Sequence, residues 1–390
     1  MDRTYNVDLN ITRECNFQCS YCFTDTKGEK VFTGYDNFKK FISKLLASSF
    51  FKDNYDLLCI NFWGGEPTLQ PAEIVNLIND LQHYDNIRFF IFSNGFKIHG
   101  YLKDALLQYK NGHVQVHPKL CIQISYDGAP IHNMYRRSFG KLTSKEVLET
   151  IKWLDVNKVP YVIKSTIRAE AFKHMYDAYM DIKRLASELT ATGFYKNVNY
   201  FPTIDYYSSE QYSKDEMNQY CEALETSLVR IAAEEAKAAQ GNFFKWFEHS
   251  RAICATGQHM IAVDTNENIY VCHGCLYGDS KEKHLIGNIN NDNIIEKLEE
   301  LSKYFGENID DEGECKECDV IFCLRCNHVK YENSKKTKYL EKWRDYTDQP
   351  NLCRFYKINS NVKKGLDLFR RNLEYGLRRT LQRMPSTPRI

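Results

Sequence analysis

Strand-like and helix-like patterns alternate along the first half of the chain. Residues 5–11, Tyr-Asn-Val-Asp-Leu-Asn-Ile, alternate apolar and polar side chains with the two-residue period of a β-strand. Strands are predicted at 5–11, 57–63, 88–93, 119–125, 161–167 and 196–202, and helices at 35–47, 71–83, 101–109, 144–156 and 171–187. Such alternation indicates a parallel sheet wrapped by helices. Six strand–helix units fall short of the eight of a closed barrel, so we expect an α/β fold with a partial (β/α)6 TIM-type barrel.

The pattern also divides the chain into four regions. The barrel is expected at 1–205, and a helical bridge at 206–250 contains a long charged helix over about 209–239. A small cysteine-rich α+β domain follows at 251–355. The tail, 356–390, is basic, and its leucines are spaced like one face of a helix. This tail either packs on the body with a solvated basic face or forms a docking surface for an acidic peptide or nucleic acid.

Composition narrows the class of protein. Among 390 residues, 43% are hydrophobic and the net charge is +1, so no overall field attracts nucleic acid or a membrane. No apolar run reaches the length of a membrane span, and the N-terminus is not a signal peptide, so we expect a cytoplasmic protein. Without an export signal, the 14 cysteines favour metal or cluster binding over disulfides.

Three of these cysteines, Cys15, Cys19 and Cys22, lie in one short loop after the first strand. Three thiolates can hold three corners of an iron–sulfur cube and leave the fourth iron open for a small molecule, whereas electron-transfer clusters usually take four cysteines. The alternative is a zinc site, which usually wants four ligands.

The spacing Cys-x3-Cys-x2-Cys, with aromatic Tyr21 before the last cysteine, resembles the loop of radical S-adenosylmethionine (radical SAM) enzymes. The resemblance implies a [4Fe-4S] cluster whose open iron binds S-adenosyl-L-methionine. It also implies that cleavage of this cofactor yields a 5′-deoxyadenosyl radical, which abstracts a hydrogen from the substrate.

Further motifs follow the predicted strands, at the face where parallel barrels place their chemistry. By resemblance, Gly64-Gly65-Glu66-Pro67 contacts the cofactor's amino group and Ser93-Asn94 its ribose. Ser125 and Asp127 are expected near cofactor or substrate, with Asp127 a candidate catalytic residue. Each of these motifs is also an ordinary turn sequence.

Two more polar groups are candidates at the same face. His132-x3-Arg136 resembles a stretch of the peptide-modifying branch, except that Asn133 replaces an aspartate. Arg136 is expected to pair with a carboxylate of cofactor or substrate, or else to form a surface ion pair. Lys164 and Thr166 are candidate cofactor-binding residues, although the sequence leaves open which of Lys164, Ser165 and Thr166 points inward.

A second cysteine set lies near the C-terminus: Cys254, Cys272, Cys275, Cys315, Cys318, Cys323, Cys326 and Cys353. Eight cysteines suffice for two four-ligand sites, and spacing does not separate zinc from iron–sulfur. The flanking residues resemble the SPASM extension of peptide-modifying radical SAM enzymes, which implies two auxiliary [4Fe-4S] clusters, three clusters in all. Carried over by resemblance, the ligands of the first auxiliary site are Cys254, Cys272 and Cys326, with Cys275 filling a missing position. Those of the second are Cys315, Cys318, Cys323 and Cys353.

The resemblance extends to the reaction. It implies an oxidoreductase that modifies a peptide or protein by cross-linking or side-chain oxidation, with a flavodoxin or ferredoxin as electron donor. His273 occupies the position of a proton-accepting aspartate in the formylglycine-forming group, related to anaerobic sulfatase-maturating enzymes, so it is a candidate catalytic residue. The alternatives are a radical SAM dehydrogenase of a small molecule, such as a sugar or amine, and a non-catalytic zinc or electron-transfer protein.

Overall fold

The computed structural model describes most of the barrel and parts of the C-terminal half. The described residues are 3–22, 24, 30–98, 100–110, 113–189, 200, 202–204, 212–237, 243–247, 250–252, 257–276, 284–307, 320, 322–324 and 350–383. No helix among them is both long enough and apolar enough to cross a membrane.

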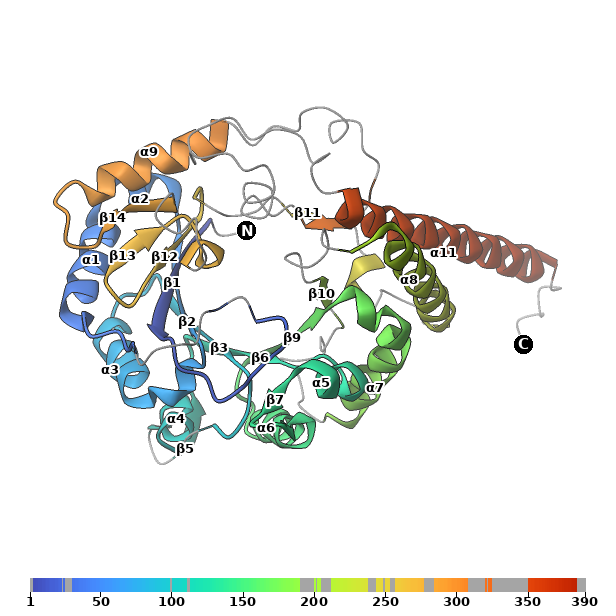
Figure 1. Cartoon of the computed structure of the whole chain (residues 1–390), viewed down its shortest axis with the longest axis horizontal. Coiled ribbons are helices and arrows are strands. Elements are labelled where there is room, and N and C mark those ends of the chain that lie inside the picture. The colour runs from blue at the N-terminus through green and yellow to red at the C-terminus, as the bar shows by residue number, and fades with distance from the viewer. Residues whose placement is uncertain are drawn as a thin grey trace, which may run out of the picture.

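One nine-stranded sheet organises the molecule (Figure 1). Its strands are, in spatial order, β10 (Pro202–Ile204), β9 (Tyr161–Ile167), β6 (Leu120–Ser125), β3 (Ile87–Ser93), β2 (Leu57–Gly64), β1 (Thr4–Thr12), β12 (Met260–Val263), β13 (Asn268–Tyr270) and β14 (Leu285–Asn288). From β10 to β1 all neighbours are parallel, which confirms the predicted partial barrel of six strands. The remaining strands form two-stranded pairs: β4 (Leu107–Lys110) with β5 (His113–Val116), β7 (Arg137–Ser138) with β8 (Lys141–Leu142), and β11 (Ser250–Ala252) with β15 (Phe322–Leu324).

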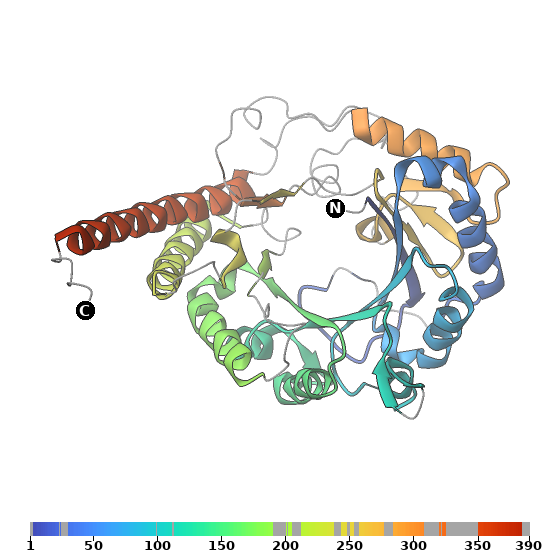
Figure 2. The same ribbon diagram turned by 180° about the vertical axis from the view of Figure 1, so that it is seen from behind.

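Helices cover the outside of the curved sheet, as Figures 1 and 2 show from opposite sides. The described α-helices are α1 (Tyr35–Ala47), α2 (Ser49–Asn54), α3 (Pro71–Leu81), α4 (Gly100–Leu106), α5 (Ala129–Tyr135), α6 (Ser144–Val156), α7 (Met175–Glu188), α8 (Lys214–Glu235), α9 (Ile294–Glu307) and α11 (Pro350–Arg383). Of these, α11 lies beside α8 and projects away from the sheet (Figure 1). Short 3-10 helices are η1 (Pro67–Leu69), η2 (Ala169–His174), η4 (Lys245–Phe247) and η5 (His273–Leu276).

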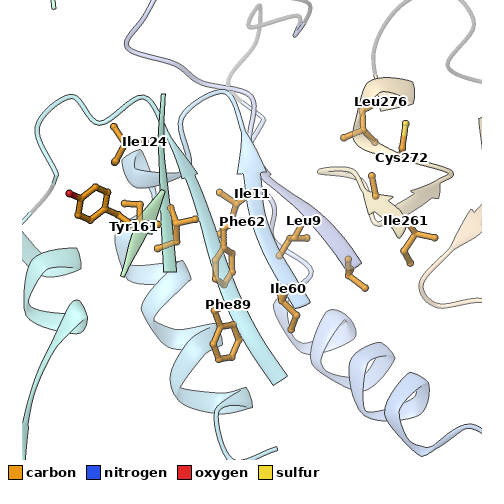
Figure 3. Packing of buried hydrophobic residues seen from close by; sticks show 14 of the residues in the cluster. Leu9, Ile11, Ile60, Phe62, Phe89, Ile124, Tyr161, Ile261, Cys272 and Leu276 are labelled. Carbon is orange, nitrogen blue, oxygen red and sulfur yellow. The ribbon is translucent and has the colours of Figure 1, made fainter. Parts of the chain in front are cut away.

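The core lies between the sheet and these helices. Along β1, the apolar positions Tyr5, Val7, Leu9 and Ile11 are fully buried, and they pack beside apolar residues of the neighbouring strands (Figure 3). The side chains between them in sequence point to the opposite face of the sheet. The strand therefore presents an apolar outer face to the helices and a polar inner face to the barrel interior.

The C-terminal strands join the same sheet. β12 pairs in parallel with β1, with Val7 opposite Ile261 and Leu9 opposite Val263, and β13 and β14 follow as antiparallel strands. The expected boundary at residue 251 stays a prediction, but the strands on its two sides are hydrogen-bonded into one sheet.

Several predicted bounds differ from the structure. The helix predicted at 101–109 ends at Leu106, because residues 107–110 pair with 113–116 across Asn111-Gly112, a hairpin sequence. The last barrel strand was predicted at 196–202 but is observed at Pro202–Ile204, and residues 196–199 lie outside the described residues. The helix predicted at 171–187 begins as the 3-10 turn η2, and the described part of the bridge helix is α8.

Helix α8 begins with a capping box that the sequence analysis missed. The Ser213 side chain accepts a hydrogen bond from the Glu216 backbone N–H, and the Glu216 carboxylate accepts one from the Ser213 backbone N–H. α11 packs beside α8, burying Phe355, Tyr356 and Leu366. The packed alternative for the tail therefore holds for this part of α11.

Candidate active site

The loop that follows β1 carries the three N-terminal cysteines. Cys15 and Cys19 are half-buried and Cys22 is exposed. Burial is the main cause that raises the pKa of Cys15 to about 12 and that of Cys19 to about 11, and the neighbouring thiols raise the pKa of Cys15 further. Metal ligands must be deprotonated, so a cationic centre bound at this loop would favour the thiolate forms that burial disfavours at Cys15 and Cys19.

Two glycines at the end of β2 allow this loop to lie against the sheet. Gly65 N–H donates to the Thr12 carbonyl at 2.8 Å, and Glu66 N–H donates to the Glu14 carbonyl at 2.7 Å. A Cβ atom would lie 2.1 Å from the Thr12 oxygen at Gly64 and 2.1 Å from the Glu14 oxygen at Gly65. Only glycine permits this approach, and Gly64 also has a φ of +145°.

Glu66 connects the ends of β2 and β3. Its carboxylate, 1% exposed, accepts hydrogen bonds from the Thr68 N–H at 3.0 Å and hydroxyl at 2.5 Å, from the Ser93 hydroxyl at 2.9 Å and from the Asn94 N–H at 2.7 Å. Burial has the largest effect on the pKa of the Glu66 carboxyl and raises it. The hydrogen bonds from the four donors act in the opposite direction. Pro67 begins η1 in the same turn. The protein thus holds this carboxylate through four hydrogen bonds, and the contact of the motif with the cofactor's amino group stays a prediction.

Asn94 links the end of β3 to the cysteine loop. Its Nδ2 donates to Asn16 Oδ1 at 2.7 Å and lies 3.9 Å from Cys15 Sγ, within the range for a hydrogen bond to sulfur. Its Oδ1 accepts from Phe96 N–H at 2.9 Å. The predicted contacts of Ser93 and Asn94 with a ribose stay predictions. In the structure Asn94 contacts the cysteine loop directly, whereas Ser93 binds Glu66.

Arg136 pairs with Asp127 inside the protein. Arg136 Nε lies 2.6 Å from Asp127 Oδ2 and Nη2 lies 3.3 Å from Oδ1, and neither residue is more than 6% exposed. Asp127 also accepts from Thr166 N–H at 2.8 Å and from the Tyr21 hydroxyl at 3.4 Å. The alternative of a surface ion pair for Arg136 is therefore wrong, because the pair is buried. The surroundings of Asp127 are those of a positioning carboxylate.

His132, four residues earlier, is also internal. Its Nε2 lies 3.0 Å from the Thr143 hydroxyl, and burial lowers the pKa of His132 to about 4, so the ring is neutral at pH 7. The same hydroxyl donates to the Arg136 carbonyl at 3.2 Å. It therefore does not cap α6, although Thr143-Ser-Lys-Glu146 has the sequence of a capping box.

The end of β9 resolves which polar groups face inward. Ser165 is buried and donates to the Tyr126 carbonyl at 2.8 Å. Because faces alternate along a strand, Lys164 and Thr166 lie on the opposite face, where Lys164 is the register partner of Ser125. Burial lowers the pKa of Lys164 to about 8. Lys164, Thr166 and Ser125 are thus the candidate ligand-facing residues of this edge.

Cys272 and Cys275, two members of the second cysteine set, lie side by side. Both are buried, and their Sγ atoms are 3.6 Å apart, with Cys272 directly before the turn η5 and Cys275 within it. Two thiolates on one tetrahedral zinc ion would be about 3.8 Å apart, given Zn–S bonds of about 2.3 Å. The distance between the two sulfurs therefore fits binding to one metal centre, and zinc remains an alternative to an iron–sulfur cluster at this site. No group of three metal-ligating side chains occurs among the described residues.

The other members are described only in part. Cys254, Cys315, Cys318 and Cys326 lie outside the described residues. Cys323 lies on β15, where its register partner is Arg251, three residues before Cys254. Cys353 is half-buried on α11. Their assignment to two sites stays a prediction.

His273 contacts two residues that the sequence analysis missed. Its Nδ1 lies 2.6 Å from Asp8 Oδ2, and its ring stacks on Trp63 with centroids 4.4 Å apart. Asn61 Nδ2 donates to the other oxygen of Asp8 at 2.6 Å. The sequence held one signal for this contact, because Asp8 is a carboxylate in the middle of a predicted strand. The partner is 265 residues away, so the pattern alone could not supply it.

The part of the chain that carries the strand-end motifs and the cysteine loop matches the model of a known protein family. Residues 9–168 match the model of the radical SAM superfamily. The chain contains a radical SAM domain. This confirms the resemblance seen in the cysteine loop, and the matched residues run from β1 to the end of β9.

Three relatives illustrate the similarity. Across 94% of this chain and 76% of its own length, the radical SAM cyclopropyl synthase TigE of Paramaledivibacter caminithermalis is 19% identical. A structure of anSMEcpe, an anaerobic sulfatase-maturating enzyme, with bound AdoMet and the Cp18Cys peptide has a TM-score of 0.64 at 17% identity. The alignment covers 95% of this chain and 99% of that one. SuiB of Streptococcus suis, bound to its precursor peptide SuiA, has a TM-score of 0.54 at 12% identity, covering 90% and 76%. At these identities the structures establish the fold of the radical SAM chain.

Replacing Gly65 by alanine should remove the metal centre without unfolding the radical SAM domain. The new Cβ displaces the Glu14 carbonyl and with it the loop that carries Cys15. We expect Gly65→Ala to lose most of the iron that depends on Cys15, Cys19 and Cys22, while far-ultraviolet circular dichroism is unchanged. The matched control is Gly100→Ala, where nothing lies within 4 Å of the new Cβ. Wild-type iron content in Gly65→Ala would contradict the argument.

Proposed function

We propose that this radical SAM enzyme oxidises a peptide or protein substrate. Cys15, Cys19 and Cys22 would hold a [4Fe-4S] cluster with one iron open for S-adenosyl-L-methionine. When bound, the two together would supply a 5′-deoxyadenosyl radical that removes a hydrogen atom from the substrate. The observation that carries the proposal is the loop with these three cysteines at the end of β1, where the charges of Cys19 and Cys22 act on the Cys15 thiol, within a matched radical SAM domain.

The residues around the loop would divide the remaining work. The backbone of Gly64 and Gly65 lies against the loop and would meet the cofactor's amino group. Ser125, Lys164 and Thr166 share one face of the sheet edge and would contact cofactor or substrate. Asp127 would act by positioning, because Arg136, Tyr21 and Thr166 already occupy its carboxylate.

The peptide substrate is supported by two structural neighbours. The anSMEcpe and SuiB structures each contain a bound peptide, and both align with 90% or more of this chain. The eight C-terminal cysteines would form a SPASM-like pair of auxiliary clusters that accepts the second electron of the oxidation. His273, placed by Asp8 and Trp63 beside Cys272, would contact the substrate near that centre.

Replacing Cys15, Cys19 and Cys22 together by alanine should abolish formation of 5′-deoxyadenosine from S-adenosyl-L-methionine under reducing, anaerobic conditions. The reason is loss of the only cluster with an open iron in this scheme. Liquid chromatography quantifies the product. Cys221→Ala, a buried helix position outside both cysteine sets, is the control and should retain wild-type turnover. Undiminished cleavage by the triple variant would overturn the proposed function.

Substrate oxidation should appear as the loss of two hydrogens, or as an oxygen-derived carbonyl, in a peptide substrate, and any short peptide encoded beside this gene is the first to test. One hydrogen leaves as an atom to the deoxyadenosyl radical, and one electron and one proton leave afterwards. Mass spectrometry after anaerobic turnover measures the change. A double variant, Cys315→Ala with Cys318→Ala, should still form deoxyadenosine but no oxidised peptide. Full product from that variant would assign a structural role to the second auxiliary site.

Cys275→Ala should change the metal content of the first auxiliary site. Because Cys275 Sγ lies 3.6 Å from Cys272 Sγ, both thiolates can bind the same centre, and removing one opens a coordination position. Iron, sulfide and zinc are counted on anaerobically purified protein, which also tests the zinc alternative. The isolated Cys121→Ala variant is the control. Counts and spectra equal to wild type in Cys275→Ala would exclude this cysteine as a ligand.

A further inference from the structure

Arg136 is a buried cation that the proposed reaction leaves without a task. It is 6% exposed and lies where α5 ends and β7 begins. Burying a guanidinium is costly unless a carboxylate and hydrogen bonds compensate it, and Asp127 does so at 2.6 Å and 3.3 Å. A buried cation that needs this compensation is expected where its charge has a functional role.

The cation lies beside the sulfur of Cys19. The charge of Arg136 and a hydrogen bond from its side chain both lower the pKa of Cys19, and its charge has a larger effect there than the opposing charge of Asp127. The guanidinium also lies 5.2 Å from the centre of the Tyr21 ring. The guanidinium therefore lies against the cysteine loop at Cys19 and Tyr21, although it is paired with Asp127.

The backbone fixes this arrangement. Gln18 N–H donates to the Arg137 carbonyl at 2.7 Å, and Ser20 N–H donates to the Tyr135 carbonyl at 3.1 Å. The residues on each side of Cys19 are thus bound to the residues on each side of Arg136. Any movement of the loop carries the sulfur and the cation together.

We propose that Arg136 raises the reduction potential of the cluster held by Cys15, Cys19 and Cys22, and that Asp127 is the positioning residue that aims it. The inference rests on the proposed function, since it needs the cluster. Potentials of iron–sulfur clusters respond to net charge and to hydrogen bonds on their sulfurs. A cation at one ligand sulfur stabilises the reduced, more negative form.

The test is a redox titration followed by electron paramagnetic resonance, on full-length protein with reconstituted clusters and without S-adenosyl-L-methionine. Omitting the cofactor removes any effect of Arg136 on the cofactor's carboxylate. The relevant signal is the one absent from the Cys15, Cys19 and Cys22 triple variant. Arg136→Gln should shift its midpoint potential to a more negative value, and Arg136→Lys, which keeps the charge, should shift it less. The control Arg3→Gln removes an exposed arginine that pairs with Asp56 and should leave the potential unchanged.

A paired variant covers the case in which Arg136→Gln destabilises the loop by leaving Asp127 without its cation. In Arg136→Gln with Asp127→Asn, both buried charges are replaced by amides of similar shape. Because Arg136 has the larger effect on Cys19, the potential should still fall below wild type, but by less than in Arg136→Gln. A wild-type potential in the single and the paired variant would overturn the inference alone. Absence of the signal from wild-type protein would overturn the proposed function as well.

Discussion

The two-sided pattern of β1 is the constraint on which the rest of the structure depends. The strand is paired on both edges, with β2 and β12, so its register is fixed from both sides. Its outer face packs the core, and its inner face carries Asp8, which binds His273. A slip of one residue would exchange the two faces, burying Asp8 against the helices. The same slip would displace the cysteine loop that follows the strand.

Two buried carboxylates, Glu66 and Asp127, hold the strand ends in place, and different partners compensate the burial of each. Glu66 forms no ion pair within the described part of the chain, and four hydrogen bonds from Thr68, Ser93 and Asn94 compensate its burial. Asp127 has Arg136 as well as hydrogen bonds. Removing one member of a buried pair typically costs about 3–5 kcal/mol, because the remaining charge is left without compensation. Both carboxylates therefore act as connectors between strand ends, and their geometry is rigid where the loop needs it.

Much of the site could be predicted because parallel strands carry their polar turns at one edge. The spacing Cys15, Cys19, Cys22 and the turn at Gly64 were sufficient for the first cysteine loop, since each is a local sequence pattern. The contacts of Asp8 with His273 could not be predicted, because they join residues 265 positions apart. The capping box at Thr143 failed for a related reason. Its hydroxyl is bound by His132 and the Arg136 carbonyl, and tertiary contacts outweigh a local preference.

The shared sheet also limits the distance between the two cysteine sets. Asp8 contacts His273, the neighbour of Cys272, and Asp8 is seven residues before Cys15. Seven residues of extended chain span at most about 25 Å. β12, which precedes the Cys272 turn, is hydrogen-bonded directly to β1, so this separation is set by a sheet. The turn η5, which carries Cys275 and directly follows Cys272, is itself packed against β12 and β13. A substrate oxidised between the two sets would therefore meet both at a fixed spacing, and its own conformation would have to adapt to that spacing.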